Sequence, residues 1–377
     1  MIYLDNAATS YPKPPQVIRA VAGAMEKLGG NPGRAGHRLS LCAGRVVNAC
    51  REELCEMLQT GSAENIVFTA NATGALNLAI KGTLHLGDEV LCTPMEHNAV
   101  MRVLTEYETA HMITVNRLPV DSLGLVQPHV LQKAITPQTA LVVVCHASNV
   151  TGVIQPVEKL GAVCRENGVP LLVDAAQTAG VLDVGLETLQ ADMVAMPGHK
   201  GLMGPQGTGV LALRRGILPT PLTFGGTGSR SESMRQPPEL PDRYESGTLN
   251  LPGIAGLLAG VRFVRRHGSA IRQYEEALTH RLLMALAGIE GVTLLGHPDA
   301  PRVGVVSFLL PNMDSSQAAD ELDRLGFAVR GGLHCAPAAH ETLGTLRSGA
   351  VRASLGPYNT EEDVDQLADA VNRLSRL

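Results

Sequence analysis

A single lysine lies in the glycine-rich stretch PGHKGLMGPQGTG, at positions 197–209. Lys200 is the last of only six lysines among 31 basic residues, and arginine occupies every later basic position. Lysine can lose its proton and act as a nucleophilic amine, whereas arginine cannot. A lone lysine in a glycine loop is usually just solvated, so this choice of residue only suggests covalent chemistry and needs support from its neighbours.

Other polar side chains follow predicted strands. Unbroken apolar runs, typical of strands covered on both faces, occupy residues 65–70, 89–94, 140–148, 170–176 and 192–196. In a parallel sheet the carboxyl ends of the strands meet at one edge, where ligands bind. The loops after these runs carry, in chain order, Thr73, His97, Asn149, Asp174 with Gln177, and His199 with Lys200.

This set of groups fits pyridoxal phosphate. The aldehyde of that cofactor needs a lysine, and its pyridine nitrogen needs a carboxylate such as Asp174. His97 is expected to stack on the ring, while Thr73 at a helix start and His199 suit the phosphate. Singly, each residue has a plainer explanation, since an aspartate at a strand end is more often a cap. Their order on consecutive strand ends favours the cofactor site.

The composition excludes several functional classes. A net charge of −5 and 3% aromatic residues argue against a nucleic-acid partner. No apolar run approaches the roughly 20 residues that cross a bilayer, and the N-terminus lacks a signal-peptide pattern, so no membrane association is expected. The seven cysteines lack CxxC pairs and zinc spacing. We therefore expect free thiols, no metal site and a cytoplasmic location.

The order of the elements predicts an α/β fold of two parts. Strands alternate with helices, which indicates a mostly parallel, doubly wound sheet, with the run at 207–213 as an antiparallel addition. The irregular stretch 215–250 is typical of a functional loop. A large domain is predicted over 15–255 and a small α+β domain over 256–377, joined by the N-terminal segment 1–14.

Cys335 stands apart from the other cysteines. In VRGGLHCAPAAH it follows a predicted strand and lies between glycines and a proline, near Arg330 and His334, which favour a thiolate. A buried structural thiol is the plainer alternative. That alternative is expected for the remaining cysteines, which are Cys42, Cys50, Cys55, Cys92, Cys145 and Cys164.

Taken together, these segments resemble the cysteine desulfurases and selenocysteine lyases of the class V aminotransferase group. The resemblance covers nearly the whole chain and rests on YLDNAAT, RAGHRLS, MEHNA, SNVTG, DAAQ, GHKGLMGPQGTG, YESGTLN, RGGLHCA and VRASLGPYNTEEDVD. It implies a fold-type I pyridoxal phosphate enzyme, with a seven-stranded sheet and a smaller α+β domain.

The resemblance also implies a reaction. L-cysteine displaces Lys200 from the cofactor, and the freed amine takes the α-proton. The Cys335 thiolate then attacks the substrate sulfur, which leaves L-alanine and a persulfide that an acceptor protein collects. His97 joins Lys200 and Cys335 as a catalytic residue of this scheme. L-selenocysteine is the second expected substrate.

Further roles follow from the same resemblance. Arg352 grips the α-carboxylate of the substrate with a bidentate guanidinium, and its plainer explanation is a surface ion pair. Asn149, Arg330 and His334 are also expected at the substrate. Thr248 is expected to reach the phosphate of a partner chain, which implies a homodimer with shared active sites.

Some positions depart from the pattern of the SufS-like desulfurases. Pro197 replaces a phosphate-binding serine, Ala72 and Gly74 replace a threonine and a glutamate, and Leu333 replaces the first of two histidines. The phosphate is therefore expected to depend more on backbone N–H groups, His199 and the neighbouring subunit.

Two alternatives to a desulfurase remain open at this point. One is a selenocysteine lyase or another class V lyase or transaminase. The other is a non-catalytic protein that only binds a sulfur carrier.

Overall fold

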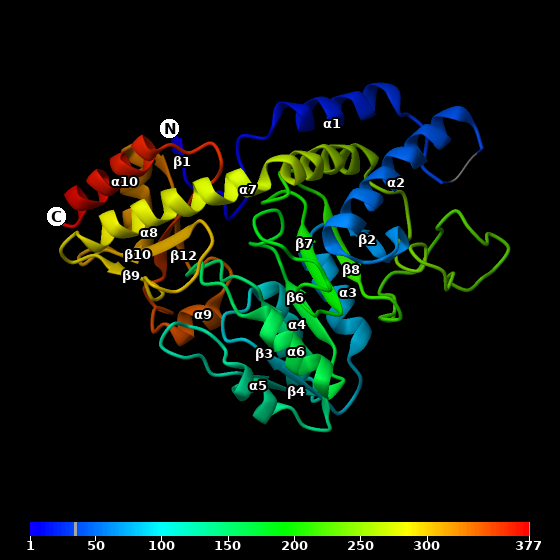
Figure 1. Ribbon diagram of the computed structural model, residues 1–377, viewed down its shortest axis with the longest axis horizontal. Helices are drawn as coiled ribbons and strands as arrows, with labels where there is room; N and C mark the ends of the chain where they lie inside the picture. Colours follow the sequence, from blue (N-terminus) through cyan, green and yellow to red (C-terminus); the bar gives the residue numbers. More distant parts are fainter. Residues whose placement is uncertain (34–35, 377) are drawn as a thin grey trace.

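The computed structural model describes residues 1–33 and 36–376, and a seven-stranded sheet forms its larger part (Figure 1). The strand order is β2-β8-β7-β6-β5-β3-β4. The strands are β2 (Ile66–Thr69), β3 (Asp88–Cys92), β4 (Ile113–Arg117), β5 (Thr139–Cys145), β6 (Leu171–Asp174), β7 (Met193–Pro197) and β8 (Gly209–Leu213). β8 runs antiparallel to β7 and β2, while β3 to β7 pair in parallel. The predicted α/β sheet and its antiparallel addition are confirmed.

Helices cover both faces of this sheet, which explains why its strands are apolar throughout. Along β5, Val142 and Val144 pack into the core under α2 (Arg38–Leu58), α5 (Pro128–Ala134) and α6 (Val157–Asn167). Leu141 and Val143 point the other way, into the core under α3 (Ala72–Thr83) and α4 (Asn98–Thr109). Because successive side chains of a strand alternate between faces, two helical layers require an unbroken apolar run.

The C-terminal part has a sheet of its own. Its strand order is β12-β13-β10-β9, formed by Arg330–Gly332, Ala350–Ser354, Val305–Leu309 and Thr293–Leu294. Three helices accompany it, namely α8 (Ser315–Arg324), α9 (Pro337–Thr342) and α10 (Glu361–Leu374). Thr360 and Asp363 form a reciprocal capping box that starts α10. Val364, Leu367, Val371 and Leu374 repeat at helical spacing and are buried.

Two segments connect the parts. The helix α7 (Leu251–Ala287) places Leu257 and Val261 in the core of the large sheet, and Leu278 and Leu282 in the C-terminal core. The strand β1 (Ile2–Tyr3) pairs in parallel with β11 (Phe327–Ala328) before the chain continues to α1 (Pro15–Lys27). The predicted boundary between residues 255 and 256 falls inside α7 and stays a prediction.

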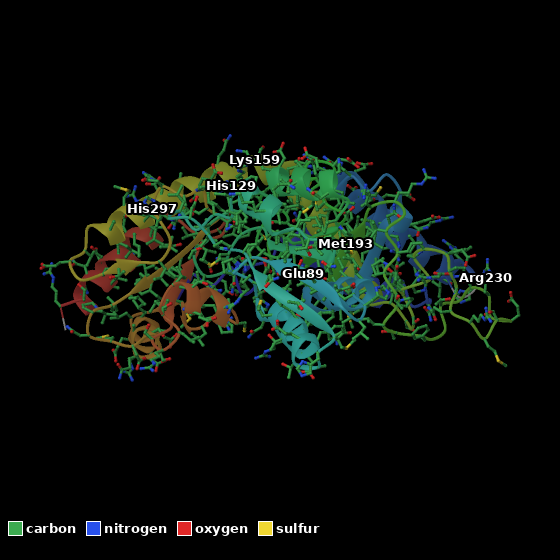
Figure 2. The ribbon with its side chains drawn as sticks, turned by 90° about the horizontal axis from the view of Figure 1, so that it is seen from below. Glu89, His129, Lys159, Met193, Arg230 and His297 are labelled. Atoms are coloured by element: carbon green, nitrogen blue, oxygen red, sulfur yellow. The ribbon has the colours of Figure 1, made fainter. Side chains whose placement is uncertain are left out.

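Among the described residues, no helix or strand lies between β8 and α7, as expected for the irregular stretch 215–250. Figure 2 shows Arg230 at the far end of this stretch, where it projects from the molecule, while Met193 lies inside. Within the described ranges, no helix combines the length and the apolar character that crossing a membrane requires.

Candidate active site

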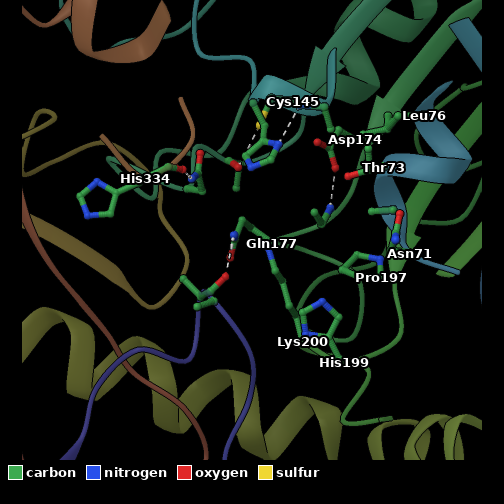
Figure 3. Close-up of a pocket in the computed structure, with 18 of the residues that line it drawn as sticks. Asn71, Thr73, Leu76, Cys145, Asp174, Gln177, Pro197, His199, Lys200 and His334 are labelled. Carbon is green, nitrogen blue, oxygen red and sulfur yellow. Dashed lines mark hydrogen bonds between the residues drawn. The ribbon is translucent and has the colours of Figure 1, made fainter. Parts of the chain in front are cut away.

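A cavity of about 240 Å³ lies where the carboxyl ends of the parallel strands face the C-terminal part (Figure 3). It brings together ten of the twelve predicted site residues, which are Thr73, His97, Asn149, Asp174, Gln177, His199, Lys200, Arg330, His334 and Arg352. Ala7 and Ala8 of the N-terminal segment also line it. Cys335 and Thr248 are not part of its wall.

Lys200 lies in the turn that follows β7, and its side chain extends into the cavity (Figure 3). Burial lowers the pKa of its amine to about 8, with Asp174 opposing this shift and Arg352 adding to it. An ammonium loses hydration when it is buried, which favours the neutral amine. The lysine that the sequence singled out is therefore available as a nucleophile and base near neutral pH.

Asp174 ends β6 and is almost fully buried. Its Oδ1 accepts a hydrogen bond from the amide of Ala176 at 2.9 Å. Burial raises the pKa of this carboxyl, although the Ala176 amide and the charge of Lys200 oppose the rise. A buried carboxylate in this position is matched by a cationic group in the cavity, such as a protonated pyridine nitrogen.

Four buried polar atoms of the cavity wall have no hydrogen-bond partner among the described residues, and two of them belong to residues that are expected to hold the cofactor. These two are Oδ1 of Asn149 and Nδ1 of His199. Leaving such atoms unpaired costs free energy, so they indicate a polar ligand. Together with the amine of Lys200 and the carboxyl of Asp174, they match the aldehyde, ring and phosphate groups of pyridoxal phosphate.

His97 is the N-cap of α4, and this fixes its ring. Nδ1 accepts a hydrogen bond from the amide of Ala99 at 3.0 Å. Burial, together with the positive charges of Lys200 and Arg330, lowers the pKa of His97 to about 4. A neutral, flat ring held in this way suits the predicted stacking on the cofactor.

The first turn of α3 forms the other end of the cavity. Asn71 caps it, since Oδ1 of Asn71 accepts from the amide of Gly74 at 2.8 Å. The amides of Ala72 and Thr73 open the helix and so have no partner within it. Helix N-termini bind anions through such amides and the helix dipole, which suits a phosphate. Sequence reasoning overlooked Asn71, although a capping signal marks it.

Two arginines form the opposite wall. Arg330 and Arg352 lie directly across from each other in the antiparallel pair of β12 and β13. The guanidinium of Arg352 is buried and donates to the carbonyl oxygen of Asn149 at 3.1 Å and to Oδ1 of Asp5 at 2.7 Å. Its Nε is buried without a partner among the described residues. This positive wall suits a substrate carboxylate.

Asp5 was overlooked by sequence reasoning. Its ion pair with Arg352 joins residues 347 positions apart in the chain. The segment YLDNAAT that contains Asp5 did contribute to the resemblance, but no local pattern shows which side chain it would contact.

Cys335 does not line the cavity, but it follows His334 and contacts Arg330, which both do. It is the one exposed cysteine of the seven, and its Sγ lies 3.8 Å from Nη2 of Arg330. His334 and Cys335 both adopt positive φ values, 52° and 58°, which side chains other than glycine rarely do. The amide of Asn98 donates to the carbonyl oxygen of Cys335 at 2.7 Å. The strained turn thus holds the thiol outside the buried pocket.

His334 lies between the thiol and the pocket. Its ring is buried, with Nδ1 unpartnered among the described residues and Nε2 3.1 Å from the carbonyl oxygen of Arg330. Burial lowers the pKa of His334 to about 3, and the charge of Arg352 adds to this shift. The side chain of Asn149 donates to the carbonyl oxygen of His334 at 2.6 Å, which links the pocket to the cysteine turn.

Thr248 lies in the irregular stretch, exposed and away from the Lys200 cavity. Its hydroxyl accepts a hydrogen bond from Nδ2 of Asn31 at 3.4 Å. It lines a separate cavity of about 490 Å³ together with residues such as Asn77 and Thr208. Its expected contact with the phosphate of a partner chain stays a prediction.

The other cysteines lie where the sequence suggested, with one qualification. Cys50, Cys92, Cys145 and Cys164 are buried, and Cys42 and Cys55 are partly buried. Cys145 also lines the Lys200 cavity, so its side chain borders the candidate site as well as the core.

Comparisons with known proteins agree with this geometry. The family model described as aminotransferase class-V matches residues 2–367. A protein of Methanothermobacter thermautotrophicus called a probable cysteine desulfurase is 34% identical over 382 residues, covering 99% of this chain and 94% of that protein. A protein of Haloferax volcanii called a cysteine desulfurase is 32% identical over 387 residues, covering 100% of this chain and 90% of the other.

A solved structure gives the same answer. The apo structure of cysteine desulfurase from Thermococcus onnurineus NA1 has a TM-score of 0.93 and 34% identity to this chain, covering 100% of it and 94% of the other. Class V aminotransferases use pyridoxal phosphate as their cofactor. This chain belongs to the aminotransferase class-V family.

Proposed function

We propose that this chain is a pyridoxal phosphate-dependent cysteine desulfurase, which converts L-cysteine to L-alanine and keeps the sulfur as a persulfide on Cys335. One juxtaposition carries the proposal. The buried amine of Lys200 and the guanidinium of Arg352 line one cavity, and the exposed thiol of Cys335 lies 3.8 Å from Nη2 of Arg330, which lines the same cavity. Transfer of sulfur from L-cysteine to a persulfide on the enzyme needs a base, a carboxylate-binding group and a thiol nucleophile together.

Each part of the cofactor has a residue to hold it. Lys200 would hold the aldehyde carbon, Asp174 the pyridine nitrogen and His97 the ring face. Asn149 and Gln177 would contact the polar edge of the ring. The amides of Ala72 and Thr73 would hold the phosphate, together with His199. When bound, the cofactor supplies an electron sink for the pair of electrons left by a proton on Cα.

The substrate is oriented by the arginine wall. Arg352 binds the α-carboxylate, which replaces part of the interaction that Asp5 makes in the free chain. Neutral Lys200 then removes the proton from Cα as a general base. Arg330 lies close to the thiol, with its Nη2 3.8 Å from Sγ of Cys335.

Sulfur transfer follows from the position of this thiol. The Cys335 sulfur attacks the substrate sulfur, so that an S–S bond forms and the C–S bond of the substrate breaks. Protonation of the carbon fragment yields alanine, and the persulfide stays on the exposed Cys335.

We further propose that an acceptor protein takes up this sulfur. We also propose a homodimer in which Thr248 completes the site of the partner. The seven free thiols suit a reducing, cytoplasmic location.

The test combines product analysis with mass spectrometry. The holoenzyme is incubated with L-cysteine, alanine is measured, and the peptide that contains Cys335 is weighed. We expect alanine together with one additional sulfur atom on that peptide. Cys335→Ala should lower alanine release by about a hundredfold or more, the scale of losing a catalytic nucleophile, while Cys42→Ala should behave like the unmodified chain.

Other outcomes identify the alternatives. Unchanged alanine release by Cys335→Ala would remove this thiol from the mechanism. Activity on L-selenocysteine alone would indicate a selenocysteine lyase. A chain that takes up no pyridoxal phosphate at all would indicate a non-catalytic protein.

A further inference from the structure

The N-terminal segment contacts the backbone of the turn that carries Lys200. The carbonyl oxygen of His199 accepts from the amide of Ser10 at 3.1 Å, from Oγ1 of Thr9 at 3.2 Å and from Nζ of Lys13 at 2.7 Å. The hydroxyl of Ser10 lies 3.1 Å from this oxygen and 3.0 Å from the carbonyl oxygen of Lys200, so it can donate to either. Several donors therefore converge on two adjacent carbonyls.

Lys13 is unusual among the lysines. Its ammonium is partly buried and, among the described residues, donates only to the carbonyl oxygen of His199 and to Oγ of Ser10, at 2.7 Å each. Within residues 1–33 and 36–376, no carboxylate forms an ion pair with it. Burial lowers its pKa to about 8. Because burying an ammonium costs it hydration, the hydrogen bonds to these two acceptors must compensate for the water that is lost. Lys159, by contrast, is exposed on α6 (Figure 2).

The other side of this turn is fixed by the turn itself. The amide of Met203 donates to the carbonyl oxygen of Lys200 at 2.8 Å. The amide of Gly204 donates to the carbonyl oxygen of Gly198, also at 2.8 Å. A Cβ atom on Gly201 would lie 2.4 Å from the carbonyl oxygen of Ala179, so only glycine fits there. The direction in which Lys200 leaves the turn thus depends on contacts from both sides.

The N-terminal segment is also anchored at its other end. Asp5 holds the guanidinium of Arg352, and the amide of Ala7 donates to Oγ of Ser354 at 2.8 Å. Residues 5–13 therefore join the proposed substrate arginine to the turn of the proposed reacting lysine.

We infer that Ser10 and Lys13 are positioning residues for Lys200, because they hold the carbonyls of residues 199 and 200. The inference rests on the proposed role of Lys200 and adds residues to that site. Neither side chain belongs to the wall of the 240 Å³ cavity, and both contact this turn at its backbone carbonyls. Ser10 and Lys200 also line a second cavity of about 50 Å³. A displacement of about 1 Å in a reacting group can lower a rate by about a hundredfold.

The experiment compares four variants of the full chain. Lys13→Met removes the donor and keeps the length of the side chain, Ser10→Ala removes the hydroxyl, and Lys13→Arg retains a donor. Lys159→Met is the matched control. Two measurements use the cofactor-free chain, namely the rate at which added pyridoxal phosphate attaches to Lys200, trapped by borohydride, and the hydrogen exchange of the amides of Ser10 and Met203.

We expect Lys13→Met to slow attachment by about tenfold or more and Ser10→Ala by a few-fold, with faster exchange at both amides. Lys13→Arg should keep most of the rate, and Lys159→Met all of it. In the loaded enzyme, kcat should fall in Lys13→Met while the KM for L-cysteine stays within about twofold, because Arg352 is untouched.

The inference is overturned if Lys13→Met and Ser10→Ala attach the cofactor at the original rate with unchanged exchange. If Lys13→Met does not fold, Ser10→Ala decides alone on the same two measurements. The proposed function fails separately. A chain whose attachment responds to these variants, but which releases no alanine from L-cysteine, keeps the positioning role and loses the desulfurase assignment.

Discussion

The amine of Lys200 and the thiol of Cys335 have opposite surroundings, although one reaction is proposed to need both. Lys200 follows a central parallel strand and is buried, and its backbone is held on both sides. Cys335 is exposed on a strained turn of the C-terminal part. The amine must be kept dry so that it is neutral, whereas the thiol must stay accessible so that its sulfur can be passed on.

The amine of Lys200 and the thiol of Cys335 also differ in the charges that lie around them. Lys200 faces one carboxylate, Asp174, and two arginines, so burial and the arginines act together against its proton. Cys335 has the guanidinium of Arg330 nearby and open solvent on its other side. Burial therefore lowers the pKa of the amine, whereas the thiol is exposed beside one positive charge.

Of the two groups, removal of the buried amine of Lys200 is expected to have the largest effect. Lys200→Ala should abolish the visible absorbance that the cofactor gains on attachment and lower alanine formation by about 10⁴-fold, because nucleophile and base are lost together. Absorbance spectra and an alanine assay provide the measurement. Lys27→Ala, at an exposed position, is the control. A Lys200→Ala chain that still bound the cofactor covalently would show that another amine is used.

A smaller effect is expected at the arginine wall between the two groups. Arg352→Lys keeps the charge but loses the forked donor, so kcat/KM should fall by about a hundredfold, mainly through KM. Arg330→Lys should affect formation of the persulfide more than KM, because its guanidinium is the one near Sγ of Cys335. Steady-state kinetics and persulfide mass spectrometry separate the two effects. Equal changes in KM for both variants would contradict this division of roles.

The smallest effect is a pH dependence. In the cofactor-free chain, the rate of attachment of pyridoxal phosphate should rise with pH through a midpoint near pH 8, where half of the Lys200 amines are neutral, and level off about one pH unit higher. Asp174 raises the pKa of Lys200, so Asp174→Asn should move the midpoint to lower pH. The rate is followed by absorbance in a series of buffers. A rate that continues to rise towards pH 10 would show that Lys200 behaves like an exposed lysine.

Much of the site around the buried Lys200 was predictable from the sequence. Five apolar runs marked the strands whose ends carry His97, Asn149, Asp174 and Lys200, because parallel strands align their carboxyl ends at one edge. β4 was missed, since only Ile113 of its five residues is buried and an edge strand lacks the continuous apolar signal.

Contacts between distant parts of the chain were less predictable. The contact of Asp5 with Arg352 and the clamp of Lys13 on His199 join distant parts of the chain. Such contacts depend on how the N-terminal segment crosses between the two parts, which no local pattern encodes. The exposure of Cys335 depends likewise on the strained turn, and its sequence allowed a buried thiol equally well.

The shared helix α7 has a mechanical consequence. With 37 residues it is a rod of about 55 Å, given a rise of 1.5 Å per residue. Residues near one end of this helix pack into the core of the large sheet, and residues near the other end pack into the C-terminal core. The parts that carry Lys200 and Arg352 are thereby connected through one continuous helix as well as through the N-terminal segment.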